Sequence, residues 1–150
     1  MRKSLTFFFV LIFGFGFTSA HAWSIDYWED PISGDTYESA YVSSFGKIFG
    51  VVCAHEGNEK GLFIVYISDY VGNPGEHHTV EYRIGDYTRQ SVWIAHNDKV
   101  LLAPTAETDN IIDEFIEADT AYFRSQTEQL TEFDIEGGEQ EIEHVISVCQ

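Results

Sequence analysis

The chain has 150 residues, of which 44% are hydrophobic, and its 25 acidic and eight basic side chains give a formal net charge of −17. This length fits one domain with a hydrophobic core of ordinary size. The acidic balance excludes nucleic acid as a partner, because phosphate binding needs a basic surface.

Residues 1–22 have the three parts of a secretory signal peptide. Arg2 and Lys3 precede an apolar run of 13 residues, and Ala20 and Ala22 stand at the −3 and −1 positions of a cleavage site. The run is shorter than the roughly 20 residues that span a bilayer, so we expect cleavage and no stable membrane insertion. The leader holds two of the eight basic residues and no acidic one, which leaves residues 23–150 with a net charge of −19. We therefore expect a single β-rich domain over residues 23–150, located in the periplasm or secreted.

Two cysteines, Cys53 and Cys149, remain after this cleavage. An even count in an oxidising compartment favours a disulfide over two buried free thiols. Such a bond would close a loop of nearly one hundred residues and tie the C-terminus to the middle of the chain.

The first part of the domain predicts strands. The segment WSIDYWEDPISGDTY is interpreted as an ordered arm before a first strand at Glu38–Phe45. Two segments that are apolar on both faces, Lys47–His55 and Leu62–Tyr70, suit central strands separated by a polar turn. Asn73-Pro74-Gly75 is typical of a turn with proline second and glycine third.

Alternation continues in the middle of the chain. Thr79–Gly85 places Val80, Tyr82 and Ile84 on one face, which indicates a half-exposed antiparallel strand. Gln90–His96 and Lys99–Ala103 flank a hairpin turn at Asn97-Asp98.

The period changes after Pro104. Four apolar residues at helical spacing predict a short helix capped by Asp109, and two further strands follow in AYFRSQ and TEFDIEG. The last segment, EQEIEHVISVCQ, predicts a helix whose apolar face is formed by Ile142, Val145, Ile146 and Cys149. The fold class is therefore α+β, mostly an antiparallel sheet or sandwich, with a short helix after Pro104 and a C-terminal helix that a disulfide tethers.

These features together resemble a known family. The segments that carry the resemblance are DPISGDTY, VVCAH, VEYRIGD, SVWIAH and FDIEGG, the last of which precedes the final helix with its cysteine. In this arrangement the chain resembles the TagO-like, or VasI-like, periplasmic proteins that are associated with type VI secretion. The resemblance implies an accessory protein of the bacterial envelope, a disulfide between Cys53 and Cys149, and no established catalytic residue.

The residues themselves give little support for chemistry. If the strand predicted from Thr79 has already begun at His77, then His77 and His78 point to opposite faces and cannot readily share a metal ion. The sequence has no G-x-S-x-G motif and no phosphate loop, and oxidised cysteines cannot act as thiolates. We expect no cofactor, no metal and no enzymatic activity.

Two groups of residues are candidates for partner binding. Between Glu107 and Glu143 there are thirteen carboxylates and one base, and among them Glu132, Asp134 and Glu136 would share one exposed face. A solubilising surface is the favoured interpretation of this charge, and a docking face is the alternative. The second group is the aromatic cluster at the start of the domain, with Trp23, Tyr27 and Trp28, which either binds a partner or caps the core.

Three functions follow as hypotheses. The first is an exported, non-enzymatic envelope accessory or binding protein with a protein partner, associated with a secretion system. The second is an inhibitor or immunity protein that blocks a basic cell-wall-degrading enzyme through the acidic face. The third, a small hydrolase, is disfavoured by the missing motifs.

Overall fold

The computed structural model describes residues 22–150, and the predicted leader lies outside these residues except for Ala22. Strands and helices follow one another along the described chain. They are β1 (Ser24–Glu29), β2 (Thr36–Ser44), β3 (Lys47–Glu56), β4 (Glu59–Ile67), β5 (His77–Ile84), β6 (Tyr87–Ala95), β7 (Val100–Leu102), the 3-10 helix η1 (Thr105–Glu107), α2 (Thr108–Glu117), β8 (Thr120–Ser125), β9 (Thr131–Asp134) and α3 (Glu139–Cys149).

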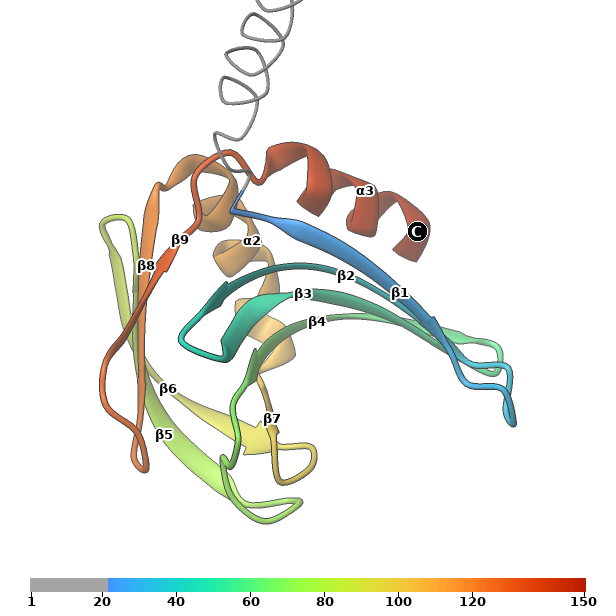
Figure 1. Cartoon of the computed structure of the whole chain (residues 1–150), viewed down its shortest axis with the longest axis horizontal. Helices are drawn as coiled ribbons and strands as arrows, with labels where there is room; N and C mark the ends of the chain where they lie inside the picture. The colour runs from blue at the N-terminus through green and yellow to red at the C-terminus, as the bar shows by residue number, and fades with distance from the viewer. Residues whose placement is uncertain (1–21) are drawn as a thin grey trace, which may run out of the picture.

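In this part of the chain nine strands form one sheet, in the order β1-β2-β3-β4-β7-β6-β5-β8-β9. Every pair of neighbouring strands is antiparallel. The sheet curls so strongly that β9 approaches β2, and β5, β6, β8 and β9 face β1–β4 across the interior (Figure 1). Helix α3 packs on β2, β3 and β4, and helix α2 contacts α3, β4 and β5. The predicted fold class is confirmed, and the layout is a single curled sheet.

The interior of the curled sheet is filled largely by aromatic rings. Phe49 of β3 lies at its centre, with its ring centroid 4.9 Å from that of Phe115 in α2 and 5.5 Å from that of Phe123 in β8. Tyr66 stacks on Phe123 at 3.9 Å. Because rings from β3 and β4 meet rings from α2 and β8, which lie much later in the sequence, the core joins both halves of the sheet.

The alternation predicted for the middle strands is confirmed. In β5 the side chains of Val80, Tyr82 and Ile84 are buried, and those between them are partly or fully exposed. The turn before β5 also has the expected form, since Glu76 N donates to Asn73 O at 3.0 Å and Gly75 has a φ of 84°. Only glycine adopts this φ without strain, which explains its place third in the turn.

Several predicted boundaries were wrong. Strand β4 covers Glu59–Ile67 and not Leu62–Tyr70, because the chain turns at Gly57-Asn58, and β5 and β6 begin at His77 and Tyr87, ahead of the predicted Thr79 and Gln90. The segment interpreted as an arm before a strand at Glu38–Phe45 is a hairpin, because Ser24–Glu29 pairs along its whole length with β2, which begins at Thr36. The predicted cap of the first helix, Asp109, lies inside α2, where the N-cap residue is Glu107 and no side chain caps the helix by hydrogen bonding.

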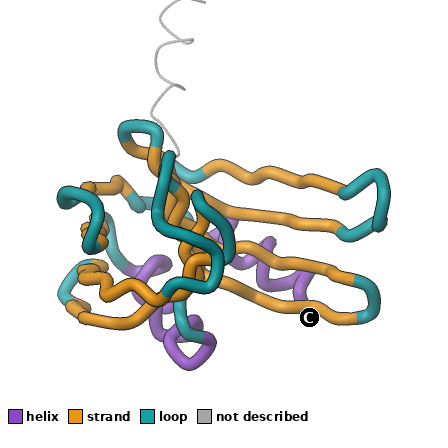
Figure 2. Tube along the Cα trace, turned by 90° about the horizontal axis from the view of Figure 1, so that it is seen from below, coloured by secondary structure: helices purple, strands orange, loops and turns teal. Residues whose placement is uncertain are grey.

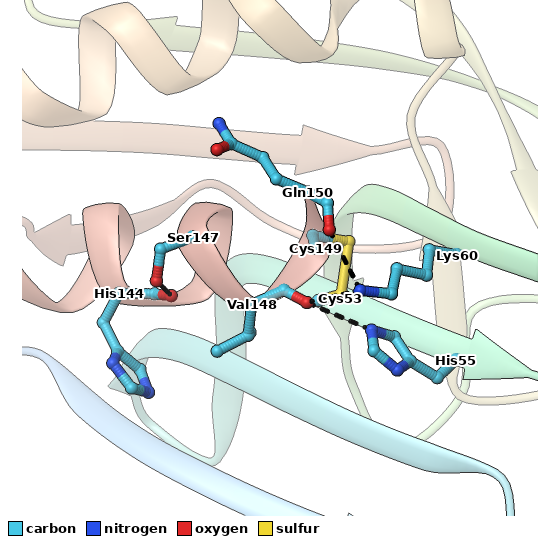
Figure 3. Close-up of a disulfide and its surroundings, with 8 residues drawn as sticks. All are labelled: Cys53, His55, Lys60, His144, Ser147, Val148, Cys149 and Gln150. Atoms are coloured by element: carbon cyan, nitrogen blue, oxygen red, sulfur yellow. Dashed lines mark hydrogen bonds between the residues drawn. A yellow bond between two sulfur atoms is a disulfide. The ribbon is translucent and has the colours of Figure 1, made fainter.

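The C-terminal helix is held by a disulfide and by polar contacts around it (Figure 3). Cys53 of β3 is bonded to Cys149 of α3, with their Cα atoms 5.5 Å apart. Lys60 Nζ donates to the Gln150 carbonyl oxygen at 3.0 Å, and His55 Nε2 lies 3.1 Å from the Val148 carbonyl oxygen. These contacts supply partners to carbonyl groups that the end of a helix leaves unpaired.

Within residues 22–150, no helix reaches the length and apolar character that a membrane crossing requires.

Candidate partner-binding surface

The structure separates Trp23 from the other two aromatic candidates. Trp23 is only 4% exposed, and its Nε1 donates to the Ile135 carbonyl oxygen at 2.8 Å. Its ring packs edge to face on Phe115 at 5.5 Å and also lies against Gly138, where an added Cβ would clash with it. Trp23 therefore belongs to the core, and it attaches the beginning of β1 to the end of β9.

Tyr27 and Trp28 lie further along β1 and are exposed to 58% and 54%. All six residues of β1 are exposed, on both faces of the strand. Trp28 contacts the ring of Tyr37 on β2, with the ring centroids 5.3 Å apart, and Ile25 adds a third large apolar side chain. The β1–β2 hairpin projects from the curled body beside the β3–β4 hairpin (Figure 2). We call β1 with these exposed side chains the aromatic edge.

The tip of this hairpin is attached to the β3–β4 hairpin by hydrogen bonds of Asp35, and Tyr37 Oη also donates to Glu56 at 3.0 Å. Asp35 accepts hydrogen bonds from Gly57 N, in the β3–β4 turn, at 2.9 Å and from Ser33 Oγ at 2.8 Å. The backbone N–H of Gly57 stabilises the ionised form, so the pKa of Asp35 lies below its ordinary value. The aromatic edge is thereby held in one position relative to β3 and β4.

The aromatic edge is surrounded by negative charge. Residues 22–46 contain five acidic residues and no lysine or arginine. The first basic residue along the domain, Lys47, lies 3.4 Å from Glu128 and is therefore already paired. A partner that approaches this hairpin therefore meets exposed apolar side chains and carboxylates, and no lysine or arginine of the hairpin itself.

The second group of candidates, Glu132, Asp134 and Glu136, is exposed as expected. Phe133 and Ile135 between them are fully buried. The alternation predicted for this segment is confirmed, and the three carboxylates form a second exposed group, on either side of Ile135, to which Trp23 donates.

Not all thirteen carboxylates between Glu107 and Glu143 lie on the surface. Glu107 accepts hydrogen bonds from Tyr82 Oη and Ser91 Oγ, both at 2.7 Å, and its side chain is 12% exposed. Burial and the carboxylate raise the pKa of Tyr82 well above its ordinary range. Glu107 thus fixes the segment before α2 to β5 and β6.

Glu128 has the same role at the β8–β9 loop. Its carboxylate accepts hydrogen bonds from Tyr66 Oη and Ser68 Oγ, and its side chain is 12% exposed. Sequence reasoning did not distinguish Glu107 and Glu128 from the exposed acids around them. The only indirect indication was that a buried tyrosine needs a hydrogen-bond partner.

The two adjacent histidines lie in strand β5, which begins two residues before the predicted Thr79. His77 is exposed and His78 is buried, because they begin strand β5 and point to opposite faces. His78 Nε2 lies 3.4 Å from a carboxylate oxygen of Glu76. Among residues 22–150, no three His, Cys, Asp or Glu side chains gather in a way that would hold a metal ion.

A shallow hollow of about 350 Å³ lies on the outer face of β5 and β8. It includes Arg83 and Arg124, which are two of the six basic residues of the domain. Both already have partners, since Arg124 is paired with Glu81 and Arg83 Nε donates to the Gly85 carbonyl oxygen at 2.8 Å. The hollow therefore offers a weaker case for ligand binding than the aromatic edge.

Comparisons with protein-family models, with curated proteins and with solved structures return no match to this chain.

Proposed function

We propose that this chain is an exported, non-enzymatic accessory protein of the cell envelope that binds a protein partner through the aromatic edge, in the periplasm and in association with a secretion system. The observation that carries the proposal is the exposure of Tyr27 and Trp28 on an edge strand that acids surround. Large aromatic side chains contribute much of the energy at protein interfaces, where they are enriched. The resemblance to TagO-like proteins and the signal-peptide pattern support the location, and the disulfide is compatible with a compartment outside the cytoplasm.

A second candidate function is an inhibitor or immunity protein against a basic cell-wall-degrading enzyme. The exposed carboxylates of Glu132, Asp134 and Glu136 favour it, because they would attract a basic enzyme. Attraction between exposed charges acts mainly on the association rate. It also weakens as the Debye length falls from about 10 Å at 0.1 M salt to about 3 Å at 1 M.

Capture from envelope extract, followed by binding kinetics on the captured protein, tests the proposal. Tyr27→Ala with Trp28→Ala should weaken binding at least tenfold. The matched control is Tyr70→Ala, which removes a tyrosine of similar exposure, 52%, from another part of the surface. If only this control weakens binding, or if wild-type protein retains no partner, the proposal is wrong.

The second candidate has its own variant and its own readout. Changing Glu132, Asp134 and Glu136 to their amides should slow association and reduce its salt dependence if the acidic surface binds the partner. Gene neighbourhood is a cheap additional test, because secretion genes favour the first function and an adjacent toxin gene favours the second. A partner whose association rate is unchanged by these three substitutions leaves the aromatic edge as the binding surface.

A further inference from the structure

Strand β1 ends the sheet with one side of its backbone unpaired by any other strand of the described chain. In an antiparallel pair, alternate residues turn their N–H and C=O groups toward the partner strand. Asp30 N donates to Asp35 O at 2.8 Å, which continues the ladder and assigns the pairing groups of β1 to Trp28, Asp26 and Ser24. The backbone groups of Ile25, Tyr27 and Glu29 therefore point away from β2.

A hydrogen bond at the centre of β1 supports this assignment. Tyr27 N donates to the side-chain Oδ1 of Asp26 at 3.0 Å, which a backbone N–H facing β2 would not do. The same bond protects the edge locally against pairing with other chains, because it gives the N–H of Tyr27 a partner when no other strand is present.

Protection of the edge is otherwise weak. Natural edge strands are blunted by lysine, proline, bulges or short length. Residues 24–29 contain no lysine or proline, and all six pair with β2 in an unbroken register. At the other end of the sheet β9 has only four residues and lies near β2. Of the two edge strands, β1 is therefore the one that is open to pairing.

We infer that β1 receives an extended segment of the partner as an additional antiparallel strand, and that this segment alternates basic and apolar residues. The inference rests on the proposed function and specifies how the partner is bound. Main-chain hydrogen bonds supply affinity in this mode of recognition, and alternate side chains supply specificity.

The side chains of β1 determine the expected alternation. Ile25 pairs with the buried Ala40, and Tyr27 pairs with Glu38, whose carboxylate contacts His144 of α3. Ile25 and Tyr27 thus lie on the face that α3 covers further along the sheet, and they favour apolar neighbours.

The opposite face of β1 carries Asp26 and Trp28. A lysine or arginine there would meet a carboxylate and an aromatic ring, and both attract a cation. A second copy of this chain is disfavoured as the occupant, because it would bring another five acids and no base to the same hairpin.

The test uses a defined probe, the capped peptide Lys-Val-Lys-Val-Thr-Val-Lys, titrated into the ¹⁵N-labelled mature protein. The amide signals of Ile25, Tyr27 and Glu29 should shift, and their hydrogen exchange should slow at least tenfold at saturation. A peptide N-methylated along one edge retains its charge and loses its main-chain donors, so it should bind at least tenfold more weakly. Replacing its lysines by glutamate should abolish binding.

A pair of protein variants isolates the backbone of β1. Tyr27→Pro removes an N–H that β2 does not use, and proline is tolerated on edge strands. Tyr27→Ala removes the same ring and keeps the N–H, so the proline variant should bind the peptide at least tenfold more weakly than the alanine variant. The peptide series remains decisive if the proline variant does not fold.

Several outcomes would overturn the inference. Equal binding of the N-methylated peptide, or signal shifts only at other surfaces, would show that the contact is electrostatic and not strand addition. A dimer of the protein that Tyr27→Pro disrupts would make a second copy the occupant. If the envelope partner is lost equally with Tyr27→Pro and Tyr27→Ala, the partner binds through side chains, so this inference fails and the proposed function stands.

Discussion

Replacing both Cys53 and Cys149 by alanine removes the covalent link between β3 and the end of α3, which joins residues 96 positions apart. In the chain-entropy model the lost loop closure is worth about 15.7 cal/mol/K, or about 4.7 kcal/mol at 25 °C. Unfolding entropy scales to about 0.27 kcal/mol/K for a domain of 128 residues. The double variant should therefore melt about 17 °C below the oxidised protein, as followed by calorimetry.

The reduced wild-type protein is the matched control, because it lacks the bond and keeps both sulfur atoms. It should melt within a few degrees of the double variant, and amide exchange in α3 should accelerate in both. A fall of less than about 4 °C, near 1 kcal/mol, would refute the reasoning and show that the packing of α3 and the contacts of Lys60 and His55 hold the helix without the bond.

Three further substitutions, one of them with a matched control, test single hydrogen-bonded side chains. Glu128→Ala leaves two hydroxyls without their acceptor and should cost about 2–4 kcal/mol in chemical denaturation, whereas Glu132→Ala, on the exposed face, should change stability by less than about 0.5 kcal/mol. Trp23→Phe removes the indole N–H that Ile135 O accepts and part of a buried ring, so it should cost about 2–3 kcal/mol in the same assay. The backbone N–H of Asn73 lowers the pKa of Glu76, so this carboxylate contributes stability above its unfolded pKa of about 4.3 and loses it as pH falls through the lower folded value. Acid titrations of stability should therefore be steeper between pH 5 and 3 for the wild type than for Glu76→Gln, and parallel curves would contradict this assignment.

Local patterns account for the parts of the fold that the sequence predicted. The alternation around Tyr82 and the helical spacing of Ile142 and Val145 depend only on which face of each element is buried, so a short window contains the signal. The order of the strands in the sheet cannot be predicted from a short window of sequence. The short strand β7 enters the sheet between β4 and β6, a placement fixed by pairing with residues that lie far away in the sequence, such as Tyr66 opposite Leu101.

The exposure of the candidate residues also depends on distant parts of the chain that a short window of sequence does not contain. Trp23 and Trp28 are five positions apart in one acidic, aromatic segment, and composition gives no reason to treat them differently. The first is buried because Ile135 and Gly138 arrive from the other end of the chain, and the second is exposed because no strand follows β1 in the sheet. The same composition predicts a solvent-exposed Glu128, whereas its carboxylate accepts hydrogen bonds from Tyr66 and Ser68.

The contacts that hold α3 and the hairpin tip also fix the position of β1 before any partner binds. The Cys53–Cys149 bond fixes α3 on β3, and Asp35 attaches the tip of the β1–β2 hairpin to the β3–β4 turn. Strand β1 is therefore held at both ends, by Trp23 at its beginning and by Asp35 beyond its end, while its outer side remains unpaired. A surface that is ordered before binding loses little entropy when a partner arrives, so the ordering cost falls on the added segment. Fixed ends with an unpaired side between them distinguish a strand that can be extended from a terminal segment that frays.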